Sequence, residues 1–312
     1  MRNRFIQLLC AWAKEDESIY LLTADLGFSV LEPFAQAFPK RFINVGIAEQ
    51  NMIGIAAGLS LMGKRIFVYS IVNFGTIRCL EQIRNDVCYH NANVVVTIVG
   101  AGLAYGLNGY THLGVEDLAV MLPMPKMKVL SPADNFELEA CMGKKKKNSG
   151  PSYLRLSKGG EPLIHSNYFH IEKSLKSELL PDINIICHGT ILYEAIKTKG
   201  LLKENYNLNL GVFSIPLLKP FPTSNCLNLL RQSKHIFLIE EHMQFGGMNS
   251  LVASLAASLG PDCPNIYAYA LDEKIMHLVG DQTYLRSSFG LNAENLLESI
   301  LRDLSIAAKL EV

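Results

Sequence analysis

The stretch FINVGIAEQNMIGIAAGLSLMGKR, residues 42–65, joins a short apolar segment to a carboxylate and then to a segment rich in glycine and alanine. Residues 42–45 predict a buried strand, and from about Ala48 the spacing of apolar residues becomes helical until Gly63. Glu49 therefore lies on the first turn of a helix, directly after a strand. Ligands of open parallel sheets gather at the carboxyl ends of strands, so Glu49 is a candidate ligand contact. The alternative is a favourable interaction with the helix dipole alone.

The rest of the chain alternates between short apolar strands and helices. We expect strands at residues 19–25, 42–45, 65–71, 93–102, 127–131 and 151–157 in the first half, and at 183–189, 209–215, 235–241 and 265–271 in the second. Further helices are expected at 1–18, 76–90, 190–204, 223–233, 247–259 and 292–304. This alternation predicts an α/β fold of two domains, each a mainly parallel sheet with helices on both faces.

A mixed, polar stretch separates the two sets of strands. We assign residues 1–158 to the first domain, 159–182 to a linker and 183–312 to the second domain. The lysine run KKKKNSG at 144–150 is typical of a solvated loop after a helix. Before that loop, Ser131 followed by a proline predicts the start of a helix that the serine side chain caps.

The composition argues against several kinds of partner. The 312 residues are 49% hydrophobic, and 29 basic residues balance 29 acidic ones. A net charge of zero gives no electrostatic reason to expect nucleic acid or a membrane surface. No apolar run is long enough for a transmembrane helix, and the amino-terminal segment lacks the cleavage site of a signal peptide. The seven cysteines are odd in number and have no C-x-x-C spacing, so we expect reduced thiols in a cytoplasmic protein and no zinc site.

Three segments of the first half place candidate functional residues after predicted strands. They are the turn that holds Glu49, the segment YSIVNF that ends at Phe74, and the glycine-rich loop 100–114 that presents His112. Carboxyl ends of parallel strands meet at one edge of a sheet, so the three segments are expected to border one crevice. Taken singly, Phe74 is compatible with a place in the core, and His112 with a structural or exposed position. The glycine spacing in the loop differs from the dinucleotide fingerprint, so NAD is not expected.

Together these segments resemble the transketolase family, which includes 1-deoxyxylulose-5-phosphate synthases and the β subunits of 2-oxo-acid dehydrogenases. The matching motifs are VGIAEQN with the later IAAGLSLMGKRIFVYSIVNF, THLGVEDLAVMLPMPKMKVLSPAD, LIEEHMQFGGMNSLVAS and FGLNAENL. The first two blocks are similar to the family's pyrimidine-binding domain, and the last two to its carboxy-terminal domain. The resemblance covers nearly the whole chain.

The resemblance implies thiamine diphosphate as the cofactor. In the family, a glutamate hydrogen-bonded to the cofactor's pyrimidine ring promotes the tautomer that takes the proton from C2, and Glu49 matches that residue. Phe74 matches the aromatic residue that packs on the pyrimidine, and Ile47 and Arg78 are further expected cofactor contacts. His112 matches the histidine that faces the substrate oxygens near C2. Burial and the helix amino terminus act on the Glu49 carboxylate in opposite directions, which suits a group that shares a proton.

The expected substrate contacts are His112, Asn108, Arg155 and Lys158. The synthase branch has an acid where this chain has Asn108, and an arginine where it has Gly100. Lys158 stands where the family has an arginine that binds sugar phosphate, and lysine lacks the bidentate fork of arginine. Two expectations follow and stay open. Phosphate is held differently, with help from Arg155 or from partner residues, or the acceptor is not a simple sugar phosphate.

The resemblance also implies a partner chain. The family's diphosphate domain binds Mg²⁺ and the diphosphate through a G-D-G motif and a downstream asparagine, and this sequence contains no G-D-G. The chain begins where the pyrimidine domain is expected to begin, so we expect a separate subunit to supply the Mg²⁺ ligands, with no metal ligand from this chain. Gly54, Ala57 and Gly58 give the Glu49 helix a face suited to close subunit packing, and we expect an α2β2 assembly.

The preferred hypothesis is the pyrimidine-binding subunit of a split transketolase, which moves a two-carbon ketol unit between sugars. One alternative is another thiamine chemistry on the same scaffold, either acyloin formation like that of 1-deoxyxylulose-5-phosphate synthase or 2-oxo-acid decarboxylation. A further alternative is a non-catalytic scaffold, which would have no need to retain Glu49, Phe74 and His112. The sequence leaves open the donor and acceptor sugars and the identity of the partner.

Overall fold

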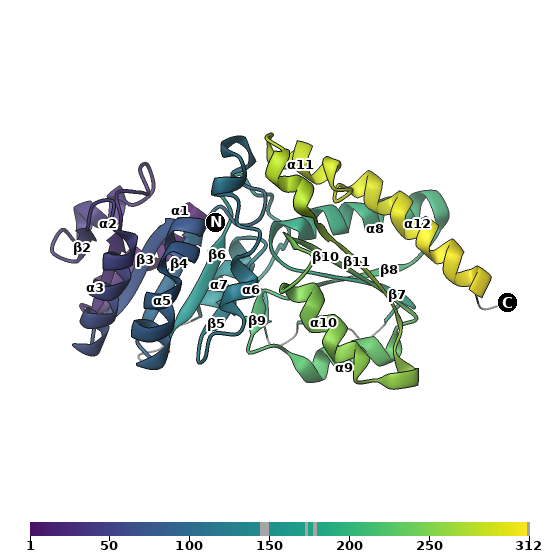
Figure 1. The fold of residues 1–312 in the computed structure, drawn as a ribbon, viewed down its shortest axis with the longest axis horizontal. Helices are drawn as coiled ribbons and strands as arrows, with labels where there is room; N and C mark the ends of the chain where they lie inside the picture. Colours follow the sequence, from purple (N-terminus) through teal and green to yellow (C-terminus); the bar gives the residue numbers. More distant parts are fainter. Residues whose placement is uncertain (144–149, 172–173, 177–179, 311–312) are drawn as a thin grey trace.

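Two sheets stand side by side in the computed structural model, which describes residues 1–143, 150–171, 174–176 and 180–310 (Figure 1). Within these residues the first sheet has seven strands in the order β2-β1-β3-β4-β6-β5-β9, and the second has four in the order β11-β10-β7-β8. All pairings are parallel except that of β5 with β9. The predicted α/β fold of two mainly parallel sheets is confirmed.

The strands are short and mostly buried, as expected for parallel sheets covered on both faces. The first sheet contains β1 (Ile19–Thr23), β2 (Phe42–Asn44), β3 (Arg65–Ile71), β4 (Val94–Val99), β5 (Lys128–Leu130), β6 (Ser152–Leu156) and β9 (Leu217–Lys219). The second contains β7 (Ile183–Cys187), β8 (Leu210–Ser214), β10 (His235–Met243) and β11 (Asn265–Leu271).

Helices cover both faces of each sheet. On the first sheet, one face packs against α1 (Arg2–Glu15), α2 (Glu32–Ala37) and α7 (Asn135–Met142), and the other against α3 (Glu49–Leu61) and α6 (Asp117–Met121). On the second sheet, one face packs against α8 (Leu192–Tyr206), α11 (Gln282–Ser288) and α12 (Ala293–Leu310), and the other against α9 (Thr223–Gln232) and α10 (Met248–Ala257). One apolar cluster runs from Met52 of α3 through Leu218 of β9 to Val252 of α10, so the two domains share a core.

The strand β9 crosses the expected division between the domains. It belongs to the second half of the sequence but pairs antiparallel with β5, with Val129 opposite Lys219. The division into 1–158, 159–182 and 183–312 therefore describes the order along the chain and stays our interpretation. Within the linker, residues 172–173 and 177–179 lie outside the described residues, as do residues 144–149 of the predicted lysine loop.

The segment predicted as a helix at 76–90 is helical from Ile77 to Tyr89, but it is not one regular α-helix. Three contiguous pieces form it: the 3-10 helix η1 (Ile77–Cys79), α5 (Leu80–Gln82) and the π-helix η2 (Ile83–Tyr89), and the short helix α4 (Val72–Gly75) precedes them. Thr76 separates α4 from η1, and its buried hydroxyl lies 3.0 Å from the Tyr153 hydroxyl. Changes of helix type of this kind are frequent at functional sites.

The predicted cap at Ser131 is wrong. The helix α7 is capped by Asp134, whose side chain accepts hydrogen bonds from the backbone N–H groups of Phe136 and Glu137. One carboxylate thus satisfies two donors that the first helical turn leaves unpaired. Ser131 is buried instead, with its hydroxyl 2.9 Å from Nδ1 of His188 in the second domain.

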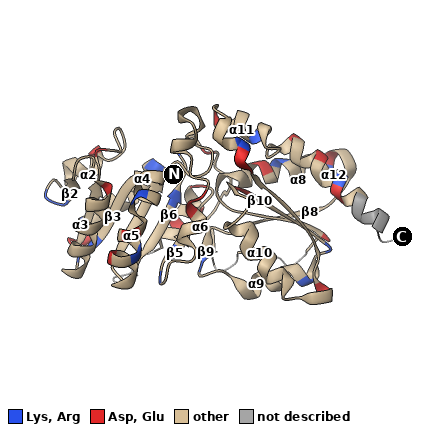
Figure 2. Cartoon of the chain, in the orientation of Figure 1, with Lys and Arg blue, Asp and Glu red and all other residues tan. Residues whose placement is uncertain are grey.

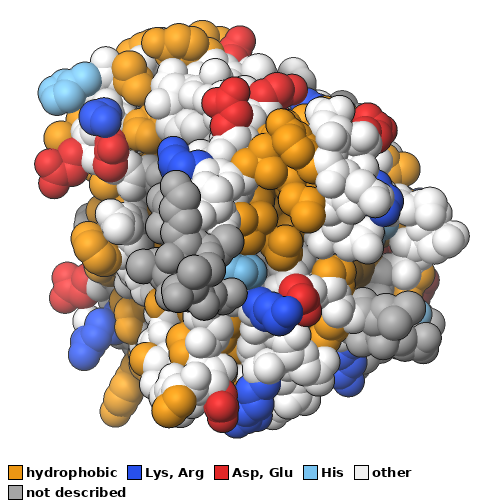
Figure 3. All heavy atoms as spheres, turned by 90° about the vertical axis from the view of Figure 1, so that its right-hand side faces the viewer, with side chains coloured by type: hydrophobic (Ala, Val, Ile, Leu, Met, Phe, Trp, Pro, Cys, Tyr) orange, Lys and Arg blue, Asp and Glu red, His pale blue; other side chains and the backbone are white. Residues whose placement is uncertain are grey.

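Charged residues of both signs are scattered over both domains (Figure 2). A view onto the end of the second domain shows basic, acidic and hydrophobic side chains interspersed (Figure 3). This distribution agrees with a net charge of zero. Among the described residues, no helix is both long and apolar enough to span a bilayer.

Candidate active site

Glu49 is the first residue of α3 and is almost completely buried. Only 4% of its side chain is exposed, and its Oε2 lies 2.8 Å from Nη1 of Arg78, a side chain that is about half-exposed. Ala56 and Ala57 of α3 belong to the core cluster against the sheet, and Glu49 is buried at the start of the same helix. A buried carboxylate needs a hydrogen-bonding or charged partner. Here the partner is Arg78, whose side chain reaches Glu49 from the protein surface.

Phe74 and His112 extend this group. The guanidinium carbon of Arg78 lies 4.5 Å from the centroid of the Phe74 ring, and the Phe74 and His112 rings meet edge to face with centroids 5.3 Å apart. Glu49, Arg78, Phe74 and His112 thus form one contiguous group, which we call the Glu49 group. The structure brings together the three segments that follow the strands β2, β3 and β4. The roles assigned to these residues stay predictions.

The loop that carries His112 is tied to its neighbours by short hydrogen bonds. Asn73 donates to the carbonyl of Thr111 at 2.9 Å, and the Thr111 hydroxyl lies 3.0 Å from Nδ1 of His112. The Tyr110 hydroxyl donates to Glu116, and this hydrogen bond raises the pKa of Tyr110 to about 12. These contacts hold the imidazole beside Phe74 without using its Nε2.

The second domain supports the same loop. A Cβ on Gly102 would lie 2.4 Å from the Glu241 carboxylate, and a Cβ on Gly106 would lie 2.3 Å from the carbonyl oxygen of Gly280. The backbone N–H of Met243 donates to the carbonyl of Val115 at 2.8 Å. Glycine is therefore required where loop and second domain come closest.

Arg155 is not placed to bind substrate. It is 3% exposed, its Nε donates to Oδ2 of Asp117 at 2.9 Å, and its Nη2 donates to the carbonyls of Gly114 and Glu241. Burial works against the charged guanidinium, but Asp117 outweighs it, so the pKa of Arg155 is raised. Position 155 lies in a central strand, and its side chain joins the two domains. The expectation of a substrate contact at Arg155 is therefore withdrawn.

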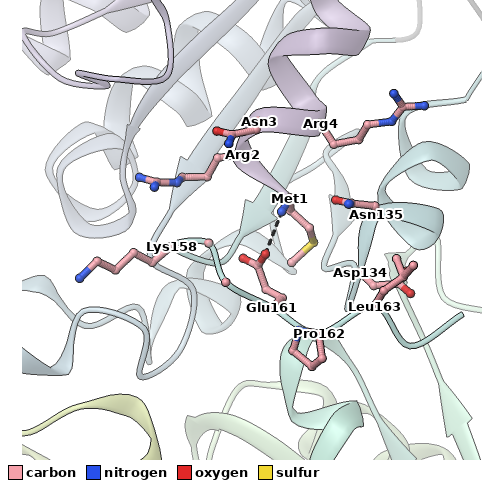
Figure 4. A pocket seen from close by; sticks show the side chains of 12 residues that line it. Met1, Arg2, Asn3, Arg4, Asp134, Asn135, Lys158, Glu161, Pro162 and Leu163 are labelled. Atoms are coloured by element: carbon pink, nitrogen blue, oxygen red, sulfur yellow. Dashed lines mark hydrogen bonds and ion pairs between the residues drawn. The ribbon is translucent and has the colours of Figure 1, made fainter.

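Lys158 follows the end of β6 and lines a pocket of about 420 Å³ together with Arg2 and Arg4 (Figure 4). Arg4 is paired with Glu139 at 2.7 Å, whereas Arg2 and Lys158 extend to the same side of the pocket. The ammonium group of Lys158 lies 5.3 Å from the centre of the Tyr105 ring. The carboxylates of the lining are paired, Glu161 with the amino terminus and Asp134 with His165, so the pocket presents two cations beside the loop that holds His112.

Gly100, where the synthase branch has an arginine, has a physical explanation in this structure. Its φ of +93° lies in the left-handed region, and a Cβ would come within 2.1 Å of the Tyr105 ring. The Tyr105 ring thus occupies the space that a side chain at position 100 would need.

The two remaining predicted contacts, Ile47 to the cofactor and Asn108 to the substrate, are both exposed, and 81% of Ile47 is accessible to solvent.

Sequence reasoning missed two residues of the Lys158 pocket region. Arg2 lies on the first helix, far in sequence from the loops after the strands, and Tyr105 looked like an ordinary loop residue. The desolvated Tyr105 hydroxyl has a raised pKa, which the neighbouring Arg2 guanidinium partly offsets. The sequence signal that could have pointed to Tyr105 is the glycine at position 100, where the synthase branch has an arginine. The space that the arginine side chain would occupy is filled here by the Tyr105 ring.

Comparisons with known proteins agree with this arrangement. The family model "Transketolase, pyrimidine binding domain" matches residues 1–161, and "Transketolase, C-terminal domain" matches residues 174–296. The 6-deoxy-6-sulfo-D-fructose transketolase subunit SqwH of Clostridium sp. (strain MSTE9) is 31% identical, over 96% of this chain and 92% of that protein. An apulose-4-phosphate transketolase subunit of Phocaeicola vulgatus is 30% identical, over 96% of each chain.

A solved structure is similar over the same length. It is described as a split gene transketolase, inactive beta4 tetramer, and superposes with a TM-score of 0.83 at 31% identity, over 97% of each chain. The chain therefore belongs to the transketolase family, and it has the pyrimidine-binding and C-terminal domains of a split transketolase subunit. The resemblance seen in the motifs is confirmed. Proteins of this family use thiamine diphosphate.

Proposed function

We propose that this chain is the pyrimidine-binding subunit of a split, thiamine-diphosphate-dependent transketolase that moves a two-carbon ketol unit between sugars or sugar phosphates. The observation that carries the proposal is the Glu49 group. A buried carboxylate, an aromatic face and an imidazole from three separate loops meet at the carboxyl edge of one sheet. Fold alone would not support a function, whereas this set of side chains has a defined chemistry.

The Glu49 group fits the pyrimidine ring of the cofactor. Arg78 shows that the group accepts a flat cation, because its guanidinium is paired with Glu49 at 2.8 Å and its carbon lies 4.5 Å from the centre of the Phe74 ring. A protonatable planar ring needs the same two contacts, one to a carboxylate and one to an aromatic face. Thiamine diphosphate, when bound, supplies a C2 carbanion as its own chemistry. The part of Glu49 is to hold and share a proton at the pyrimidine nitrogen.

The pocket of Lys158 and Arg2 is the proposed site for the far end of the substrate. Two cations that extend to the same side suit a terminal anionic group. Two of the relatives are named for substrates that carry a phosphate or a sulfo group. We therefore propose a sugar substrate with a terminal anion, bound by Lys158 and Arg2 in place of the family's arginine, with Asn108 on the exposed loop beside it.

The diphosphate and Mg²⁺ are assigned to a partner subunit. Among the described residues, no group of three or more His, Cys, Asp and Glu side chains could hold a metal ion. The Glu49 group opens to the surface at Arg78, which is about half-exposed, so it suits one wall of a site. The seven free thiols support a place in the reducing cytoplasm.

The isolated chain is predicted not to bind thiamine diphosphate, because the diphosphate carries most of the cofactor's charge and its ligands are in the partner. Calorimetry with Mg²⁺ present should show no binding at roughly micromolar concentrations, and tight binding once the partner is added. The pair without Mg²⁺ is the matched control. Tight, Mg²⁺-dependent binding by this chain alone would contradict the assignment.

The assembly is predicted to be α2β2, with two copies of this chain and two partners. The helix α3 supports this, because a Cβ at Gly54 or Gly58 would meet no atom within 4 Å, and Leu61 and Met62 beside them are 64% and 76% exposed. Light scattering of the purified complex should give the mass of four chains. A stable one-to-one complex at working concentrations would rule out this arrangement.

His112→Ala is predicted to lower kcat by about 100-fold while cofactor affinity changes little, because His112 faces substrate oxygens and not the pyrimidine. Steady-state kinetics of the assembled complex, together with calorimetry, separate the two effects. His90→Ala, at an exposed histidine beyond the Glu49 group, is the matched control. Equal kinetics in the His112 and His90 variants would return His112 to a structural role.

A further inference from the structure

A second cavity, of about 300 Å³, lies between α1 and α7 on the face of the first sheet that these helices cover. Most of its wall is apolar, and the main contributors are Trp12, Phe67, Val95, Leu130, Met142 and Leu154. The polar side chains in the wall are those of Arg65, Lys128, Cys141 and Ser152. A largely apolar cavity with a few placed polar groups is typical of sites for small molecules.

The cavity is separate from the Glu49 group. Arg65 and Ser152 are the first residues of β3 and β6, so the cavity lies at the amino ends of the strands. The Glu49 group follows the carboxyl ends of the strands, and it lies on the α3 side of the sheet. The seven residues of β3 span roughly 20 Å at the rise of an extended strand. A ligand in this cavity would not touch the cofactor or the substrate.

Arg65 is the unusual group in the wall. It is only 6% exposed, and its guanidinium carbon lies 5.0 Å from the centre of the Trp12 ring and 5.2 Å from that of Phe67. In the part of the chain that the structure describes, its buried Nε has no hydrogen-bond partner. Burial lowers the pKa of Arg65, and Asp16 offsets this only in part. A buried, unpaired donor on a cation is costly, and nearly all such groups have a partner.

We propose that this cavity binds a small amphipathic carboxylate. The apolar tail would lie against Leu130, Met142 and Leu154, and the carboxylate would accept hydrogen bonds from the guanidinium of Arg65. The aromatic rings of Trp12 and Phe67 lie near the guanidinium, at 5.0 Å and 5.2 Å from its carbon, which leaves the N–H groups along its edge for an anion. That edge matches the planar geometry of a carboxylate. The inference is independent of the proposed catalytic function.

The chain carries its own reporter for this site, because Trp12 is its only tryptophan and lines the cavity. The experiment is a titration of the isolated full chain with sodium hexanoate, followed by tryptophan fluorescence, with hexanamide as the uncharged probe of equal length. We expect a saturable change with hexanoate and an affinity for hexanamide lower by about tenfold or more, the scale of one hydrogen bond to a charged group.

Two variants sharpen the test. Arg65→Met should remove the preference for hexanoate over hexanamide, whereas Lys64→Met, at a neighbouring cation that lies over Tyr20 outside the cavity, should keep it. Equal affinity of the wild-type chain for both probes would overturn the proposal, as would a lack of any saturable change with hexanoate. The comparison of the two probes on the wild-type chain decides the matter even if Arg65→Met fails to fold.

Discussion

Glu49→Gln lowers ketol transfer by about 100-fold or more while the complex still folds and binds thiamine diphosphate, on the scale of lost acid-base catalysis. Glutamine is nearly isosteric with glutamate, so the packing of α3 survives, and its amide still forms hydrogen bonds. It cannot share a proton with the pyrimidine nitrogen, so removal of the C2 proton slows. The measurement is exchange of the cofactor's C2 proton for deuterium in the assembled complex, followed by NMR.

The control for Glu49→Gln is the same chemical change at an exposed carboxylate. Glu81 lies on α5, close in sequence to Arg78, and is exposed. Glu81→Gln should exchange the C2 proton at the wild-type rate. If the Glu49 variant also exchanges at that rate, Glu49 is not the activating carboxylate, and the mechanistic argument for the site fails.

Asp117→Asn destabilises the chain by about 3 kcal/mol or more, because it leaves the Arg155 charge buried without its counter-ion. Asp117 is fully buried, accepts from Nε of Arg155 at 2.9 Å and also accepts from the Tyr153 hydroxyl at 2.7 Å. Arg155 in turn donates to the backbone of Gly114 and Glu241, so the loss spreads to the contact between the domains. Urea unfolding of the isolated chain measures the effect.

An exposed ion pair provides the matched control for Asp117→Asn. Arg4 and Glu139 are 2.7 Å apart, but their side chains are 39% and 29% exposed. Glu139→Gln should change stability by about 1 kcal/mol or less, as for most surface pairs. Equal losses of stability in the two variants would show that the Arg155–Asp117 pair does not join the domains as described.

The residues of the Glu49 group were predictable because their positions follow from topology. Glu49, Phe74 and His112 lie in the segments that follow the strands β2, β3 and β4, and parallel strands bring their carboxyl ends to one edge. The alternation of strands and helices also indicated the fold, since it is a local pattern. The strand and helix pattern depends on neighbouring residues in the sequence, and the meeting of the three segments follows from the geometry of parallel sheets. Neither requires knowledge of contacts between residues far apart in the sequence.

Features that depend on distant contacts were missed. Arg155 was expected near substrate, because sequence reasoning cannot tell a side chain at the end of a central strand from one directed into a domain contact. The three residues of β9 are too few to indicate a strand, and their partner β5 lies far away in sequence. The cap of α7 went to Asp134, because contacts with the second domain take up Ser131. In each case a contact between the domains decided the outcome.

The central claim is that this chain completes a ketol-transferring site with a subunit that carries the G-D-G motif. The most direct measurement is NMR of the products formed by the co-purified pair with thiamine diphosphate and Mg²⁺. One reaction contains a ketose donor and an aldose acceptor, and the other contains pyruvate in place of the ketose. We predict a ketose two carbons longer than the acceptor in the first reaction and no product in the second. Release of CO₂ from pyruvate, with no transfer from the ketose, would contradict the account in favour of a synthase or a decarboxylating enzyme.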